Sequence, residues 1–338
     1  MRITPLKLSL TLLTTYLIVS PSIVSALSME ACLAIAAAEA SDTTTVGELR
    51  RNCELQIHAL ETMKAEAADK PTPYTPVERR YLRELSIRDN RFAITAHRPN
   101  YLLIAAHDTS GVIPAGLPGT VGEDTESTFQ VSMKFPLIEN LFGDGRGDIY
   151  AAYTNRSFWQ VYDKAGSSPF RETNHEPEAW FSWKTDWHFA GFHNRAIRVG
   201  LNHQSNGRGG NSISRSWNRI FTEFIFERSN YAGSLKTWWR IPEDDAEDDN
   251  PDIDDYMGFF EFTAVYTRKK HSFSMMFRNN LRSENRGAAQ LEWNFPLIKH
   301  FDGYVQFFNG FGESLIDYDA NVNSIGIGVL SLIHISEP

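Results

Sequence analysis

The fold is decided by two neighbouring stretches, IRVGLNHQSNGR at residues 197–208 and RSWNRIFTEF at residues 215–224. Side chains two residues apart lie on the same face of a β-strand. In the first stretch Ile197, Val199 and Leu201 therefore share one apolar face, and the residues between them are polar or glycine. Two alternating segments separated by a polar loop predict a pair of antiparallel strands.

The same alternation recurs to the end of the chain. We count about twelve such segments, near residues 100–108, 126–136, 147–160, 176–187, 191–205, 215–228, 233–241, 256–267, 271–281, 287–296, 302–311 and 320–330. Their connections alternate in length, with short turns at 229–233 and 268–271 and long polar connections at 158–175, 206–214 and 242–255. Tight turns at one end and long loops at the other are typical of an outer-membrane barrel.

These features predict an all-β fold, a transmembrane antiparallel β-barrel of about twelve strands over residues 91–329. A soluble β-sandwich shows a similar alternation and stays as the alternative, but these strands are long and their connections are sorted by length. The low mean hydropathy of −0.35 fits a barrel, because only one face of each strand meets lipid.

Composition excludes several other classes of protein. The chain has 338 residues, of which 42% are hydrophobic and 22% charged, so a disordered chain is disfavoured. A formal net charge of −9 disfavours a general nucleic-acid binder, which needs a basic face. Two cysteines are too few for a disulfide scaffold or a cysteine-rich zinc domain.

The first residues predict export. Two basic residues precede an apolar stretch at residues 8–19, and small residues then lead to Ala26. This order indicates a secretory signal peptide over residues 1–26. A retained membrane anchor is the alternative, but the apolar run is short for a membrane span.

Residues 27–90 predict a helical periplasmic extension and linker. Ala, Glu and Leu dominate its first part, which favours two short helices with a break near residues 41–45. Cys32 and Cys53 fall one on each helix, so an oxidising compartment makes a disulfide between them plausible. Three prolines within residues 70–76 indicate a linker.

The predicted hairpin carries a candidate catalytic site. His203 and Ser205 continue the apolar face of the first strand, and Asn218 lies on the mostly apolar face of the second. A serine beside a histidine that a third residue orients is the arrangement of a nucleophile and its base. The backbone N–H groups near Gly207 are candidate oxyanion donors. On a barrel, this site faces lipid at the end of the strand.

Two long motifs and two weaker ones carry a resemblance to a known family. They are NHQSNGR at 202–208 with SRSWNR at 214–219, SSPFRETNHEP at 167–177, DNPDI at 249–253 and GESLIDY at 312–318. On these motifs, residues 92–329 resemble the outer-membrane phospholipase A family.

The resemblance implies a twelve-stranded outer-membrane barrel that hydrolyses the acyl esters of phospholipids, with phospholipase A1, phospholipase A2 and lysophospholipase activity. The family needs calcium and is active as a homodimer in the membrane. Its nucleophile, base and orienting amide match Ser205, His203 and Asn218, and Asn155 matches a polar residue of its dimer contact.

The resemblance also implies the ligands of the catalytic calcium. A loop backbone carbonyl matches Arg208, a serine of the same loop matches Ser214, and a serine from the partner's loop matches Ser167. Oxygen ligands with water suit calcium. The loop here is one residue longer than the family suggests and lacks a carboxylate, which leaves Ser212 as an alternative to Ser214.

Other positions have structural interpretations. Gln204 replaces a common family aspartate but falls on the inward face. We expect an inward hydrogen-bonded network that braces the barrel wall, formed by Arg171, Glu172 and Asn174. Trp217 predicts a packing or interfacial aromatic. The segment 243–255 has nine acidic residues in thirteen but no glycine for an EF-hand turn, which favours a solvated outer loop.

Residues 330–338 read like the translation of a sequencing adapter, and we expect them to be an artefact that follows Val329. Two other functions stay open from the sequence. One is a non-enzymatic porin or structural barrel that kept the hairpin without activity. The other is a soluble secreted esterase.

Overall fold

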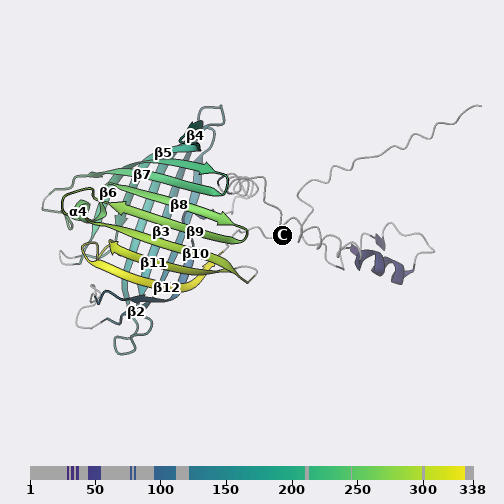
Figure 1. The fold of residues 1–338 in the computed structure, drawn as a ribbon, viewed down its shortest axis with the longest axis horizontal. Helices are drawn as coiled ribbons and strands as arrows, with labels where there is room; N and C mark the ends of the chain where they lie inside the picture. Colours follow the sequence, from purple (N-terminus) through teal and green to yellow (C-terminus); the bar gives the residue numbers. More distant parts are fainter. Residues whose placement is uncertain are drawn as a thin grey trace, which may run out of the picture. The chain divides into compact units, whose positions relative to one another are not determined.

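A computed structural model of the chain describes residues 45–54, 95–111, 122–209, 213–244, 246–298 and 301–331, with a few single residues between 29 and 80. Twelve antiparallel strands form a closed barrel in which each strand pairs with its sequence neighbours and β1 pairs with β12 (Figure 1). The strands are β1 Tyr101–Asp108, β2 Thr125–Ile138, β3 Gly147–Trp159, β4 Phe170–Phe189, β5 Phe192–Ser205, β6 Ser216–Arg228, β7 Tyr231–Ile241, β8 Phe260–Arg268, β9 His271–Asn279, β10 Gly287–Ile298, β11 Phe301–Phe311 and β12 Asn321–Ser331.

The predicted fold class is confirmed, and each predicted strand is present. The largest boundary error is at β4, which begins at Phe170 rather than near residue 176. The polar motif RETNHE at 171–176 has the composition of a loop. Inside a barrel, however, charged side chains find partners, so β4 includes this motif. The signal peptide predicted for residues 1–26 and most of the expected artefact at 330–338 lie outside the described residues.

The two faces of the wall have opposite character, as the alternation predicts. On β5 the side chains of Val199 and Leu201 are 47% and 57% exposed, whereas Asn202, the residue after Leu201, is 2% exposed. An apolar outer face suits a hydrocarbon environment. Among the described residues, no helix combines the length and the apolar character needed to cross a membrane.

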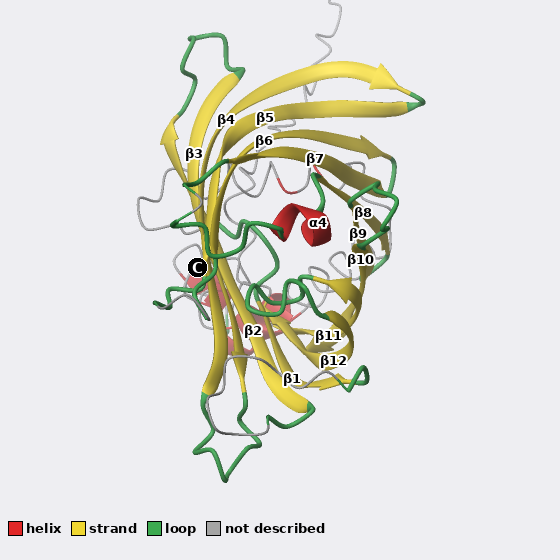
Figure 2. Cartoon of the chain, turned by 90° about the vertical axis from the view of Figure 1, so that its left-hand side faces the viewer, coloured by secondary structure: helices red, strands yellow, loops and turns green. Residues whose placement is uncertain are grey.

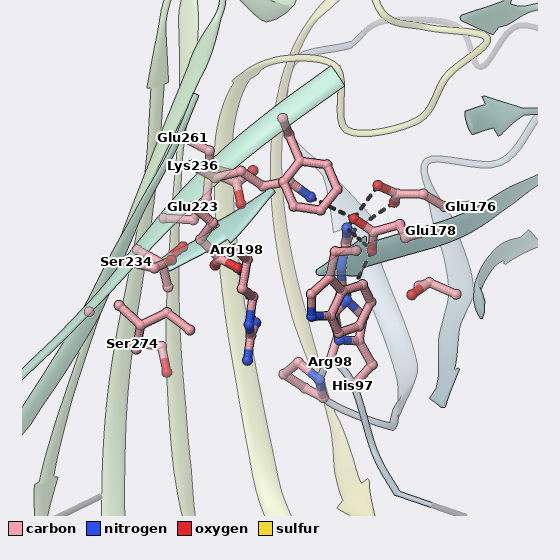
Figure 3. Close-up of a pocket in the computed structure, with 18 of the residues that line it drawn as sticks. His97, Arg98, Glu176, Glu178, Arg198, Glu223, Ser234, Lys236, Glu261 and Ser274 are labelled. Carbon is pink, nitrogen blue, oxygen red and sulfur yellow. Dashed lines mark hydrogen bonds and ion pairs between the residues drawn. The ribbon is translucent and has the colours of Figure 1, made fainter. Parts of the chain in front are cut away.

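The interior of the barrel holds a network of buried charges (Figure 3). Glu178 accepts hydrogen bonds from Lys236 at 2.6 Å, His97 at 2.9 Å and Arg98 at 3.2 Å. Arg98 also makes a bidentate pair with Glu176, with both distances 2.8 Å. These groups line an interior cavity of about 800 Å³. His97 and Arg98 come just before β1 in the chain and line this cavity, so the segment that leads into the first strand lies inside the barrel.

The predicted bracing network is also present. Arg171 pairs with Glu126 and Asp317, and Asn174 donates to Glu172 at 2.7 Å. All of these side chains are buried. The network joins β2, β4 and the loop before β12, so it ties distant parts of the wall together.

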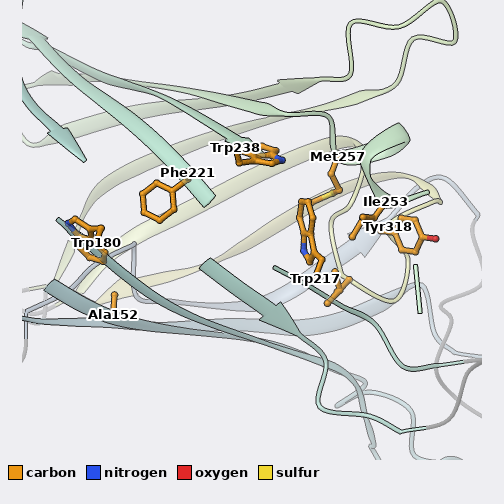
Figure 4. Packing of buried hydrophobic residues seen from close by; sticks show 9 residues of the cluster. Ala152, Trp180, Trp217, Phe221, Trp238, Ile253, Met257 and Tyr318 are labelled. Carbon is orange, nitrogen blue, oxygen red and sulfur yellow. The ribbon is translucent and has the colours of Figure 1, made fainter. Parts of the chain in front are cut away.

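An apolar cluster packs inside the barrel near the long loops (Figure 4). The short helix α4, Ile253–Met257, lies within the barrel outline (Figure 2) and buries both of its end residues. Trp217 and Trp238 pack edge to face at 6.3 Å between ring centroids. The packing role predicted for Trp217 is therefore confirmed.

The acidic segment 243–255 is a solvated loop only in part: Asp244, Glu247 and Asp252 are exposed, whereas Asn250 and Ile253 are buried. Two of its carboxylates have partners on the barrel: Asp248 pairs with Arg240 at 2.7 Å, and the Tyr318 hydroxyl donates to Asp252. Burial and this carboxylate raise the pKa of the Tyr318 hydroxyl well above its usual range. Composition alone missed this because it does not show which basic and hydroxyl groups the fold brings to the loop.

A disulfide joins Cys32 and Cys53 in the N-terminal unit, as the sequence made plausible. Helix 46–54 begins with a capping box in which Glu48 N–H donates to Thr45 Oγ1 and Thr45 N–H donates to the Glu48 carboxylate. The backbone hydrogen bond from Thr45 lowers the pKa of Glu48. The helix thus starts where the sequence predicts a break between two helices.

Replacing Cys53 with serine is expected to destabilise this unit by about 3 kcal/mol, because the cross-link closes a loop of 21 residues. Limited proteolysis at increasing urea checks this: cleavage within residues 27–70 should begin at lower urea in the variant. The barrel is the internal control, since its unfolding midpoint should not change. Equal protease resistance of both proteins would contradict a stabilising role for the bond.

Candidate active site

The register of β5 and β6 brings the predicted base and orienting residue together. His203 lies directly opposite Asn218 in the pairing of these strands. The His203 ring atom Nδ1 and the Asn218 oxygen Oδ1 are 2.8 Å apart. A proton on Nδ1 makes this a donor–acceptor pair and leaves Nε2 free to accept a proton. The sequence anticipated this contact from strand parity alone.

Ser205 lies two residues beyond His203 on the same strand and therefore on the same face. That face is the outer one, because it continues the row of exposed Val199 and Leu201. Asn218 continues the outward row of β6, in which Ile220 is exposed. All three predicted side chains are partly buried on the outside of the wall, at the end where the long loops emerge.

The intervening residues point inward, as expected. Gln204 accepts a hydrogen bond from the indole N–H of the buried Trp217 at 2.9 Å. Asn202 donates to Glu176 at 2.7 Å within the interior network. The cavity of about 800 Å³ is lined by Gln204 and other inward residues, so the cavity and the candidate catalytic residues lie on opposite faces of the wall.

The loop after Ser205 is held by one buried side chain, Asn206. Its Nδ2 donates to the carbonyl of Ile213 at 2.7 Å, and its Oδ1 accepts from the N–H groups of Arg208 and Arg215 at 3.2 and 3.1 Å. Gly207 follows with a φ of +65°, a conformation that favours glycine. Asn206 therefore shapes the backbone that carries the candidate oxyanion and calcium groups, a role that sequence reasoning missed.

His175 on β4 lies opposite Ser205 in the strand register. Its Nδ1 is 2.6 Å from the hydroxyl oxygen of Tyr153 and 3.5 Å from the amide nitrogen of Asn155. In the sequence, His175 stands out only as part of the motif at residues 167–177. The register instead places it on the same outer surface as the candidate nucleophile.

The candidate calcium ligands come from two loops. Ser214 donates its hydroxyl to Asp249 at 2.5 Å, and Arg208 occupies the same β5–β6 loop, although residues 210–212 lie outside the described ones. Ser167 is exposed in the β3–β4 loop, with a φ of +64°. Within the described ranges, no group of three or more His, Cys, Asp or Glu side chains is arranged to hold a metal. Asp249 belongs to one of the two weaker motifs of the sequence, and its carboxylate lies beside Ser214.

The comparison with known families decides the identity of the chain. Residues 77–331 match the family model described as Phospholipase A1. The chain belongs to the phospholipase A1 family. The match spans the whole barrel, including both strands that carry the candidate site.

Two phospholipase A1 family members are similar over most of their length. Phospholipase A1 of Escherichia coli strain K12 is 34% identical over 280 residues, which cover 82% of this chain and 93% of that protein. Phospholipase A1 of Klebsiella pneumoniae is 35% identical over 250 residues, or 73% of this chain and 85% of that protein.

Solved phospholipase structures agree with the barrel. Outer membrane phospholipase A from Escherichia coli has a TM-score of 0.66 and 35% identity, covering 72% of this chain and 93% of that one. The Salmonella typhi outer membrane phospholipase, described as a dimer with bound calcium, has the same score and identity and covers 72% and 94%. An asparagine-to-alanine variant of the Escherichia coli protein is described as an active-site mutant.

These relationships establish the general activity. This phospholipase A1 family member is a phospholipid ester hydrolase built on an outer-membrane β-barrel. The soluble-esterase and non-enzymatic interpretations of the sequence are therefore set aside.

Proposed function

We propose that Ser205, His203 and Asn218 carry out this hydrolysis, acting on phospholipid acyl esters at either chain position and on lysophospholipids. The observation that supports this most strongly is the 2.8 Å contact between His203 Nδ1 and Asn218 Oδ1 on the outer face. Ser205 follows on the same face, where a phospholipid can arrive laterally from the bilayer.

The reaction then proceeds by acyl transfer. Ser205 Oγ attacks the ester carbonyl and its proton passes to His203 Nε2. The ester C–O bond breaks, and His203 returns the proton to the leaving glycerol oxygen. Water, deprotonated by His203, then hydrolyses the acyl-serine and releases the fatty acid. Backbone N–H groups near Gly207 stabilise the oxyanion.

Calcium is the metal that the neighbouring oxygen donors fit. Ser214 Oγ, the Asp249 carboxylate beside it and the Arg208 carbonyl are hard oxygen ligands of the kind calcium prefers. When bound, the cation would polarise the ester carbonyl. We propose that Ser167 of the partner subunit completes the ligand set, so that the active form is a homodimer. The Salmonella typhi relative, a dimer with bound calcium, supports this proposal.

Removal of calcium provides the test. Fatty-acid release from mixed phospholipid–detergent micelles by the purified protein should fall to background with a calcium chelator and return when calcium is restored. Ser214→Ala should raise the calcium concentration for half-maximal activity by roughly tenfold, because one oxygen ligand is lost. A larger effect of Ser212→Ala would instead assign the ligand to Ser212. Ion conductance without chelator-sensitive hydrolysis would contradict the proposed function.

A further inference from the structure

A carboxylate lies at the far end of the contact between His203 and Asn218. The Asn218 nitrogen Nδ2 donates to Glu243 Oε1 at 3.1 Å, while Asn218 Oδ1 meets His203 at 2.8 Å. We propose that Glu243 is a positioning residue for the catalytic histidine, acting through Asn218. This inference rests on the proposed function, because its effect reaches the substrate through His203 and Ser205.

The strand register explains why Glu243 reaches this place. Ile241, the last residue of β7, lies directly opposite Asn218 on β6. Glu243 comes two residues later and therefore continues the outward row that includes the exposed Trp239. The Glu243 side chain is partly buried, whereas its loop neighbours Asp244 and Glu247 are exposed.

The hydrogen-bond chemistry of the amide gives Glu243 a definite effect. An ionised carboxylate only accepts hydrogen bonds, so the donor end of the Asn218 amide must face it. The acceptor end then faces His203 and selects the tautomer with the proton on Nδ1. Nε2 is left as the acceptor that Ser205 requires. Without Glu243, the amide could turn over and favour the opposite, inactive tautomer.

Glu243 also supplies a charge that the amide lacks. His203 becomes an imidazolium when it takes the Ser205 proton, and a neutral amide balances that charge less well than a carboxylate does. The Glu243 carboxylate, one side chain beyond Asn218, attracts the His203 imidazolium. This attraction is stronger beside hydrocarbon than in water. Nearby basic groups are engaged elsewhere: Arg219 contacts Glu176 inside the barrel, and His175 lies on the other side of Ser205.

Two substitutions separate orientation from charge. Glu243→Gln keeps an acceptor for the amide but removes the charge, and Glu243→Ala removes both. The control is Glu247→Gln, which makes the same charge change on an exposed side chain of the same loop. The measurement is kcat and KM for phospholipid in mixed micelles with saturating calcium, across pH 5 to 9.

We expect Glu243→Ala to lower kcat by roughly tenfold with little change in KM, well short of the roughly 10⁴-fold loss seen when the histidine tautomer is fully inverted. Glu243→Gln should lose less kcat but move the acid limb of kcat/KM to lower pH, because losing a nearby negative charge lowers the pKa of an imidazole. Glu247→Gln should change neither quantity. A role limited to folding would not shift the pH profile.

The outcomes distinguish this inference from the function on which it rests. If Ser205→Ala is inactive but both Glu243 variants keep the wild-type kcat and acid limb, the role of Glu243 is wrong and the catalytic triad stands. If Ser205→Ala remains active, the triad itself is wrong. Glu243→Gln is nearly isosteric, so it provides a folded variant even if Glu243→Ala does not fold.

Discussion

Replacing Ser205 with alanine is expected to lower phospholipid hydrolysis by roughly 10⁴-fold or more, as for other serine hydrolases that lose the nucleophile. The alanine side chain cannot form the acyl-enzyme, and His203 has no hydroxyl to deprotonate. The effect should appear in kcat, because micelle binding depends on the apolar outer wall rather than on one hydroxyl. Fatty-acid release from mixed micelles, followed by titration of the liberated acid, measures it.

A matched control is Ser272→Ala, the same chemical change on β9 beside the short turn at residues 269–270. This variant should keep wild-type activity. A serine-reactive fluorophosphonate should label the wild-type protein and the control but not Ser205→Ala. Substantial hydrolysis by Ser205→Ala would show that the nucleophile is another group.

Replacing Glu178 with alanine should strongly destabilise the barrel. Glu178 accepts hydrogen bonds from Lys236, His97 and Arg98, and its side chain is 1% exposed. Removal of one partner from a buried ion pair leaves the other charge uncompensated, which costs about 3–5 kcal/mol. We therefore expect the free energy of unfolding to fall by roughly 3 kcal/mol.

Urea unfolding in phospholipid vesicles, followed by tryptophan fluorescence, measures this change. Glu247→Ala removes an exposed carboxylate and is the control, which should stay within about 0.5 kcal/mol of the wild type. Glu178→Gln keeps the side-chain volume and should fall between the two. If Glu178→Ala unfolds at the wild-type midpoint, the prediction is wrong. The charges of Lys236, His97 and Arg98 would then be compensated by water in the interior cavity.

The sequence predicts the fold well because the alternation of one strand is a local property. The parity of residues 197–205 placed His203 and Ser205 on the outer face, and the exposed Leu201 confirms that face. The opposing strand required only the assumption of a hairpin, and the register indeed sets Asn218 across from His203. Local periodicity therefore sufficed for the core of the candidate site.

Contacts that depend on loop conformation could not be predicted in this way. Asp249 reaches Ser214 across 35 residues, and Glu243 reaches Asn218 across 25. Both belong to a segment whose composition indicates solvent exposure, and no periodic pattern fixes where a loop folds back. The start of β4 was misjudged for a related reason, since charges at Arg171 and Glu172 favour a loop unless the fold supplies buried partners.

The position of Ser205 at one rim of the barrel has a consequence for the membrane. With the proposed nucleophile on the outer wall at the end of β5, a lipid can be cleaved without leaving its own monolayer, and lipids of the opposite monolayer lie beyond reach. The direction in which the barrel is inserted therefore decides which side of the bilayer is degraded. Both products, a fatty acid and a single-chain lipid, are released into that same layer.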